Sequence, residues 1–297
     1  MSFASDTKTE LCRAPLSRPC CQRAELYGIL LFCNTFSASE LRLLTEHRGF
    51  LLRTEKLLRR TAGLEIDEKR DEDSGLRSLL IRDPEKLKAI RALYGVEPER
   101  NPAHHVNLGV LEEDCCRASF LRGAFLAGGS IVSPRKSYHL ELITGHYNVS
   151  REVEALMDEM GFRPGRLSRN GNYVLYFKHS ETIEDLLTLL GAPQAALELM
   201  NAKVEKEVLN GVNRRLNCDE ANLDKTVNAA LSQLAAIRRL RESGRLDSLS
   251  PKLREAAELR EQHPELNLSQ LAALASPPVT KSTLNYRMKK LAELADA

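Results

Sequence analysis

One stretch near the end of the chain gathers side chains that donate hydrogen bonds or carry positive charge. No acidic residue lies between Lys281 and Lys290, and the first one after it is Glu293. The donors of this stretch are Lys281, Ser282, Thr283, Asn285, Tyr286, Arg287, Lys289 and Lys290. Such groups bind nucleic-acid phosphates and read base edges. The sequence therefore predicts that these residues contact double-stranded DNA.

Position along this stretch separates two kinds of contact. Lys281, Thr283 and Asn285 come first, where a groove-bound helix meets the bases, and the Asn285 amide suits a bidentate contact to adenine. Lys289 and Lys290 come later, where such a helix usually meets the phosphate backbone. We therefore expect Asn285 to read sequence and the two lysines to hold DNA of any sequence.

Two short helices are expected to position these donors. Asn267–Leu274 has the pattern of a helix capped by its first residue, Ser276–Pro278 ends it, and Thr280–Leu294 forms a second helix. Leu284, Met288 and Leu291 give this second helix an apolar face. The pattern predicts a helix-turn-helix. The alternative is a three-helix bundle with a basic solvent face; the confinement of the basic excess to one helix favours DNA reading.

The seven cysteines are the residues best suited to metal or redox chemistry. Four form the adjacent pairs Cys20-Cys21 and Cys115-Cys116, and the others are Cys12, Cys33 and Cys218. Zinc sites usually show Cys-x₂-Cys or histidine partners, whereas adjacent side chains on a helix point apart. We therefore expect reduced structural thiols and no metal or cofactor, with a redox or metal role as the alternative. His104-His105 is expected in a solvent-exposed loop, with metal binding as its alternative.

Small residues predict a close contact between two helices. In Phe120–Ser130 an apolar helix carries, along one edge, Gly123, Ala124, Ala127 and Gly128. Cys20–Cys33 repeats the pattern 95 positions upstream, where Gly28 matches Gly123. A helix edge without bulk lets a second backbone approach closely, which multiplies dispersion contacts. The repeat therefore predicts an interface through Gly28, Gly123 and Ala127.

Leu121–Gly129 resembles the motif of the LAGLIDADG homing endonucleases, which pair two such helices. In that family the eighth motif position is an acidic residue that holds the catalytic metal ions. Here the position is Gly128 in one copy and Cys33 in the other. Glycine offers no side-chain ligand, and a lone thiol suits Mg²⁺ poorly. We therefore expect the scaffold without catalytic residues or nuclease activity.

The segments after each of these helices follow one order: strand, helix, two strands, helix. The elements expected in the first copy are Ser39–Glu46, Gly49–Ala62, Leu64–Arg70, Leu76–Arg82 and a helix from Pro84, with a turn at Asp71–Gly75. Those of the second copy are Tyr138–Thr144, Asn148–Met160, Arg163–Leu167, Tyr173–Phe177 and Thr182–Leu190, with an Asn170-Gly171 hairpin turn. Further helices are expected at Ser2–Arg13, Pro193–Leu209, Leu223–Arg241 and from Pro251 to about Gln262.

The expected fold class is α+β: a two-repeat LAGLIDADG-like α/β saddle with a separate all-α helix-turn-helix domain. The expected domains are residues 1–109 for the first repeat, 110–212 for the second and 217–297 for the helix-turn-helix. Asn101–Gly109 is the expected linker between the repeats. The polar run Asn213–Asp219 is the expected joint before the third domain.

Composition limits how the chain can bind nucleic acid. Its formal charge is +2, with 42% hydrophobic and 28% charged residues, so nucleic-acid affinity must come from a local patch. Aromatic residues make up 5% and tryptophan is absent, which argues against base stacking as the main mode of binding. No apolar run approaches the ~20 residues of a membrane span, and the start is polar. We expect a cytoplasmic, nucleoid-associated protein with no membrane partner.

Nearly the whole chain resembles the WhiA family. The resemblance rests on the paired Cys-Cys helices, Phe120–Ser130, Asn217–Ala230, Asp247–Leu249 and Pro277–Leu291. It implies an inactive LAGLIDADG-like domain, a C-terminal helix-turn-helix and sequence-specific transcriptional control of sporulation or of cell division and chromosome segregation. A second regulator or RNA polymerase would be further partners. Two other classes stay open: an active nuclease, and a protein-interaction scaffold with only non-specific DNA affinity.

Overall fold

The computed structural model describes residues 2–16, 18–71, 75–96 and 103–296. They divide into two compact units, Met1–Glu207 and Val208–Ala297. The turn predicted at Asp71–Gly75 and the linker predicted at Asn101–Gly109 fall partly outside the described ranges, at residues 72–74 and 101–102. None of the helices in those ranges combines the length and the apolar character that a membrane span needs.

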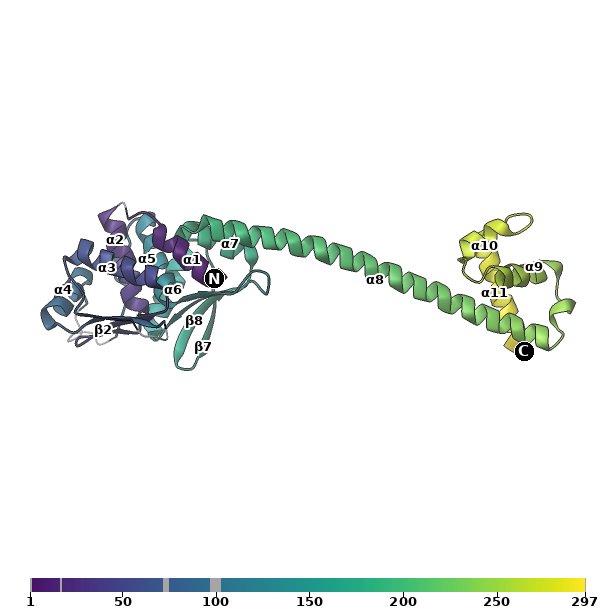
Figure 1. Cartoon of the computed structure of the whole chain (residues 1–297), viewed down its shortest axis with the longest axis horizontal. Helices are drawn as coiled ribbons and strands as arrows, with labels where there is room; N and C mark the ends of the chain where they lie inside the picture. The colour runs from purple at the N-terminus through teal and green to yellow at the C-terminus, as the bar shows by residue number, and fades with distance from the viewer. Residues whose placement is uncertain (1, 17, 72–74, 97–102, 297) are drawn as a thin grey trace. The chain divides into compact units, whose positions relative to one another are not determined.

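The first unit contains two copies of one α+β arrangement (Figure 1). The first copy consists of α2 (Pro19–Phe32), β1 (Thr35–Phe36), β2 (Leu41–Thr45), α3 (Arg48–Ala62), β3 (Glu68–Asp71), β4 (Arg77–Ile81) and α4 (Pro84–Tyr94). The second consists of α5 (Asp114–Gly128), β5 (Gly129–Ile131), β6 (Leu140–Thr144), α6 (Tyr147–Glu159), β7 (Gly165–Arg169), β8 (Asn172–Phe177) and α7 (Ser180–Leu190). The predicted α+β repeat is confirmed, with one short strand after each long helix that the prediction lacked.

Each copy forms a four-stranded antiparallel sheet, ordered β1-β2-β4-β3 in the first and β5-β6-β8-β7 in the second. Helices cover one side of the sheets (Figure 1). Leu41 and Leu43 of β2, like Leu140 and Leu142 of β6, turn toward these helices and are almost fully buried. Their alternation with less buried residues is the period-2 pattern of a strand with one covered face.

Local signals fix several element ends. Asn170 and Gly171 have φ of 52° and 77°, the left-handed backbone that a tight two-residue hairpin turn requires. The Asp83 carboxylate accepts hydrogen bonds from the backbone N–H groups of Glu85 and Lys86 at 2.9 and 3.2 Å, which caps α4. These short-range predictions are confirmed because they depend on neighbouring residues alone.

A buried ion network ties the helices of the first unit together. Glu25 of α2 is fully buried and forms ion pairs with Arg53 of α3 and with Arg122 of α5, the latter at 3.2 Å. The remaining Arg53 donor, Nη1, bonds the carbonyl oxygens of Cys12 and Ala14 at 2.9 and 2.7 Å. Since the charges are paired and hydrogen-bonded, their burial is compatible with a stable fold.

His104 and His105 lie in a loop, as the sequence predicted, but only His105 is exposed. His104 is half-buried between two rings, 5.4 Å from Phe36 and 4.4 Å from His146 between ring centroids. The His105 Nδ1 atom lies 2.6 Å from a Glu152 carboxylate oxygen. The sequence did not predict the partial burial of His104, because its ring partners lie far away in the sequence.

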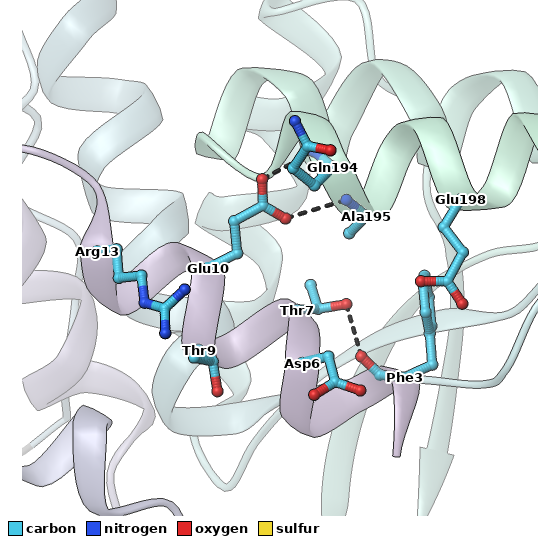
Figure 2. Close-up of a pocket in the computed structure, with 9 residues that line it drawn as sticks. All are labelled: Phe3, Asp6, Thr7, Thr9, Glu10, Arg13, Gln194, Ala195 and Glu198. Carbon is cyan, nitrogen blue, oxygen red and sulfur yellow. Dashed lines mark hydrogen bonds between the residues drawn. The ribbon is translucent and has the colours of Figure 1, made fainter. Parts of the chain in front are cut away.

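The first turn of α8 (Pro193–Glu242) is capped by α1 (Phe3–Arg13). Figure 2 shows the Glu10 carboxylate pointing at the start of α8, where it accepts hydrogen bonds from the backbone N–H groups of Gln194 and Ala195 at 2.8 and 3.0 Å. A carboxylate at a helix N-terminus satisfies unpaired donors and suits the helix dipole.

The second unit is all helical. Besides most of α8 it contains α9 (Pro251–Gln262), α10 (Leu268–Leu274), α11 (Lys281–Asp296) and a short 3₁₀ helix, Leu246–Ser248. Its core is formed by Ile237, Leu240, Leu246, Ala256, Ala257, Leu271, Ala272, Leu284, Met288 and Leu291. The joint predicted at Asn213–Asp219 is not a break, because α8 runs through it without a helix end. Polar residues there are compatible with a solvated helix that neither glycine nor proline interrupts.

Candidate nucleic-acid interface

The second helix of the predicted helix-turn-helix is α11, and it packs through one face. Leu284, Met288 and Leu291 follow helical spacing and are at most 2% exposed. On the opposite face, at the same spacing, lie Ser282, Tyr286, Lys289 and Glu293, all exposed. The Tyr286 side chain is 68% exposed. A packed face and a hydrogen-bonding solvent face are what a groove-entering helix requires.

The Glu255 carboxylate of α9 positions α11 and the turn before it. One carboxylate oxygen accepts the backbone N–H of Ser276 at 2.7 Å, and the other pairs with the Arg287 guanidinium at 3.1 Å. The Val279 N–H donates to the Ala272 carbonyl at 3.0 Å, which closes the turn onto α10. Sequence reasoning missed Glu255, since its partners lie 21 and 32 residues away.

The residues predicted to contact DNA differ in how exposed they are. Lys281, Ser282, Thr283, Tyr286, Lys289 and Lys290 are exposed, and Asn285 is half-buried at the flank of the solvent face. Arg287 is the exception, because its side chain is only 11% exposed and is held by Glu255. In this arrangement Arg287 positions α11 and is turned away from the exposed donors. Glu293, 3.1 Å from the Lys290 ammonium, raises the pKa of Lys290 and keeps it charged.

Arg260 of α9 anchors the start of α10. It is 2% exposed, and its Nε donates to the Gln233 side chain of α8 at 2.9 Å. Its Nη1 donates to the Leu266 carbonyl at 2.7 Å, immediately before the Asn267 cap. Asn267 and Gln270 form a capping box on α10, which satisfies the first N–H groups of this short helix. The predicted Asn267 cap is confirmed.

In the first unit, α2 and α5 cross at two glycines. A Cβ atom on Gly28 would lie 2.1 Å from the Phe120 carbonyl oxygen, and one on Gly123 would lie 2.0 Å from the Glu25 carbonyl oxygen. The next neighbours are the backbone nitrogens of Ala124 and Ile29. Adding 95 to positions 25, 28 and 29 gives 120, 123 and 124, so the two contacts are equivalent. The helices therefore cross about an approximate two-fold axis.

The C-terminal ends of the crossing helices carry no carboxylate at the positions that match the metal-binding acid of the LAGLIDADG motif, which are Gly128 and Cys33. A Cβ on Gly128 would lie 2.3 Å from the Ile143 carbonyl oxygen, so a larger side chain has no room there. The Cys33 thiol donates to the carbonyls of Leu30 or Thr35, each at 3.2 Å, and burial raises its pKa to about 12. The Lys8 ammonium bonds the Leu126 carbonyl at 3.1 Å. These surroundings favour a cation from the protein over a metal ion.

The side chains of the two adjacent cysteine pairs converge on one another. This corrects the expectation from helix geometry that they point apart. The Sγ atoms of Cys20, Cys21, Cys115 and Cys116 all lie within 4.8 Å of one another. Among the described residues this is the one group of three or more His, Cys, Asp or Glu side chains that could hold a metal ion. The repeat offset already matched the two pairs in sequence, and the crossing of α2 and α5 brings them together.

Comparisons with known proteins agree with this architecture. A family model described as the WhiA LAGLIDADG-like domain matches residues 117–209, and one described as the WhiA C-terminal helix-turn-helix domain matches residues 212–295. The crystal structure of full-length DUF199/WhiA from Thermotoga maritima has a TM-score of 0.61 at 24% identity and covers 100% of this chain and 98% of that one. The fold thus defines a helix-turn-helix protein that carries a LAGLIDADG-like repeat pair.

Relatives of known name give the family. A probable cell division protein WhiA of Ruminiclostridium cellulolyticum is 35% identical over 100% of this chain and 97% of its own length. A protein of the same name from Desulforudis audaxviator is 38% identical, with the same coverage. The chain belongs to the WhiA family.

Proposed function

We propose that this protein is a sequence-specific DNA-binding regulator without nuclease activity, and that α11 reads the DNA. The observation that carries the proposal is the solvent face of α11, where Ser282, Tyr286 and Lys289 lie opposite the packed apolar face. Hydroxyl, phenol and ammonium groups on one exposed helix face match what phosphates and base edges accept. Within the proposed domain of residues 217–297, α9 and α10 hold this face in place.

The charges on the first unit also favour the second unit as the part that binds DNA. On the side of the sheets away from the helices, arginines are paired with acids: Arg42 and Arg82 with Glu40 at 3.5 and 2.9 Å, and Arg169 with Glu141 at 3.3 Å. Paired guanidinium groups have less charge to offer a phosphate. We therefore assign most DNA affinity to the second unit. The genes that it binds would act in cell division, which the names of the relatives state, or in sporulation.

The absence of nuclease activity is proposed from the residues at the ends of α2 and α5. Two-metal phosphodiester cleavage needs carboxylates that hold both ions, and the equivalent positions are Gly128 and Cys33. Incubating plasmid DNA with the protein in Mg²⁺ or Mn²⁺ should leave the plasmid intact. Reproducible cleavage that purifies with the full chain would contradict this part of the proposal.

Footprinting on genomic fragments tests the regulator directly. We expect the full chain to protect a defined sequence at physiological salt. Replacing Asn285 by alanine should then cost about 1–3 kcal/mol on that sequence and little on a scrambled duplex. Lys252→Ala is the control, because Lys252 is an exposed cation on α9. Absence of any protected sequence would favour a protein-interaction scaffold with non-specific DNA affinity.

A further inference from the structure

Four cysteines converge where α2 and α5 begin. Pro19 and Asp114 are the first residues of these helices, so Cys20 and Cys115 are second in their helices, and Cys21 and Cys116 are third. The four Sγ atoms lie within 4.8 Å of one another. The cluster lies at the N-terminal ends of the helices, whereas the nuclease metal position lies at their C-terminal ends.

The approximate two-fold axis relates the two pairs. Cys21 contacts Cys115, and Cys20 contacts Cys116. Adding 95 to 20 and 21 gives 115 and 116, so the axis exchanges one contact with the other. Each helix therefore contributes two sulfurs to one compact group that surrounds the axis. An ion on the axis would therefore have an equivalent pair of sulfur ligands from each helix.

The donors and their spacing match one kind of ion. Zn²⁺ prefers four ligands in a tetrahedron, and with Zn–S bonds of about 2.3 Å the sulfurs of a Cys₄ site lie about 3.8 Å apart. Sulfurs within 4.8 Å of one another need only small side-chain rotations to reach that geometry. We propose that Cys20, Cys21, Cys115 and Cys116 bind a single Zn²⁺ ion as a structural Cys₄ site.

Burial raises the pKa of the Cys21 and Cys116 thiols, and other groups around the cluster offset the cost of the thiolate form that a metal needs. Each pair lies in the first turn of its helix, where backbone N–H groups and the positive end of the helix dipole stabilise negative charge. Here two such helix ends meet at one group. The Arg18 guanidinium adds a cation, with Nη1 at 3.7 Å from the Cys115 Sγ atom. Four thiolates around Zn²⁺ carry a net charge of −2, and these groups offset it.

The exposure of the four cysteines suits a structural site that an ion can still reach. Cys116 is 3% exposed and Cys21 and Cys115 are intermediate, whereas Cys20 is exposed, so an ion can enter from the side of Cys20. Four protein ligands leave no open position for water or substrate, as in structural zinc sites. The ion would join the two repeats at the end of the helix pair, where the contact between the glycines does not reach.

The test measures zinc in the full chain. Protein purified with a reductant, incubated with Zn²⁺ and desalted should retain one zinc ion per chain, with X-ray absorption giving four sulfur neighbours at about 2.3 Å. Co²⁺ in place of zinc should give the intense visible bands of a tetrahedral thiolate site. Cys20→Ser should lose the retained metal while keeping its fold, because Cys20 is exposed. Cys218→Ser is the control, since Cys218 is an exposed cysteine of α8, and should retain it.

Three results would overturn the proposal. The reduced chain could stay free of zinc after incubation. Cys20→Ser and Cys115→Ser could retain as much zinc as Cys218→Ser, which would place the ion elsewhere. Thiol mapping of the protein purified without a reductant could find a Cys20–Cys116 or Cys21–Cys115 disulfide, which would make the cluster a cross-link. DNA binding enters none of these readouts, so they are independent of the proposed regulator function.

Discussion

Glycine at positions 28 and 123 is required by the backbone of the facing helix. An added Cβ would lie 2.1 and 2.0 Å from a backbone carbonyl oxygen, and backbone cannot rotate away as a side chain can. We therefore expect Gly28→Ala and Gly123→Ala each to lower the free energy of unfolding by about 1–3 kcal/mol or more. Chemical denaturation followed by circular dichroism measures the loss.

Gly211 provides the matched control for these two glycines. It also lies inside a helix, α8, but nothing lies within 4 Å of its added Cβ. Gly211→Ala should therefore stabilise its helix by about 0.5–1 kcal/mol through the higher helix propensity of alanine. If all three substitutions had the same effect, the close approach of α2 and α5 would not be what selects glycine.

The adjacent rings of His104 and His146 give the first unit a pH-dependent stability. Burial lowers the pKa of His104 and of His146 below the ordinary value of 6.5, and His104 repels a charged His146. The unfolded chain therefore takes up protons first as the pH falls through 6.5, and the stability present above that pH is progressively lost. We therefore expect the unfolding midpoint to decrease as the pH is lowered from neutral to mildly acidic.

A double variant isolates this contribution. His104→Asn with His146→Asn should flatten the dependence of the unfolding midpoint on pH below 6.5. His179→Asn, at an exposed position, should leave the dependence as it is. An unchanged slope in the double variant would assign the pH dependence to other groups.

At the scale of elements, sequence patterns predicted what depends on neighbouring residues. The Asn170-Gly171 turn, the Asp83 cap and the Asn267 cap follow from side chains one to three positions apart, and the structure has all three. The strands β1 and β5 could not be predicted in this way, since they are two and three residues long. They exist because β2 and β6 offer them partners.

The site shows the same division between local and distant signals. Helical spacing predicted the packed face of α11, whereas the ion pair of Arg287 with Glu255 depends on a residue 32 positions away. The sequence prediction considered each cysteine pair on its own helix, where adjacent side chains point apart, and so it did not expect the cysteines to share an ion. Their convergence depends on how α2 crosses α5, and only the repeat offset of 95 positions pointed to it.

The junction of α1 with α8 gives a prediction for one element. Glu10→Gln keeps an oxygen acceptor but removes the charge, while Glu10→Ala removes both. Loss of the cap should lower the free energy of unfolding by about 0.5–2 kcal/mol, more for alanine than for glutamine. Thermal unfolding measures this. Glu198→Gln, at a residue that lines the same pocket (Figure 2), should have little effect; an equal loss would show that charge in the pocket matters and the cap does not.

For the whole molecule, DNA affinity should follow the second unit. A chain of residues 217–297 should keep most of the affinity of the full protein, and one that ends at Glu207 should lose it. Lys289→Ala should make the salt dependence of binding shallower by about 0.9 in the log–log slope, because one lysine contact releases one counterion. Lys290→Ala should have a smaller effect, because Lys290 is paired with Glu293. Titrations at several salt concentrations measure this, with Lys252→Ala as control. Comparable affinity of the two chain halves would contradict the assignment.

The equivalence of the two glycine contacts has a consequence for either repeat on its own. Separated from its counterpart, residues 103–207 would expose the Gly123 edge of α5, and the surface most similar to the lost α2 is another copy of α5. We expect this fragment to self-associate as a homodimer, with Gly123 of each copy against Phe120 of the other. Light scattering after size exclusion measures its mass, and a well-folded monomer would show that the two repeats have diverged too far to substitute for each other.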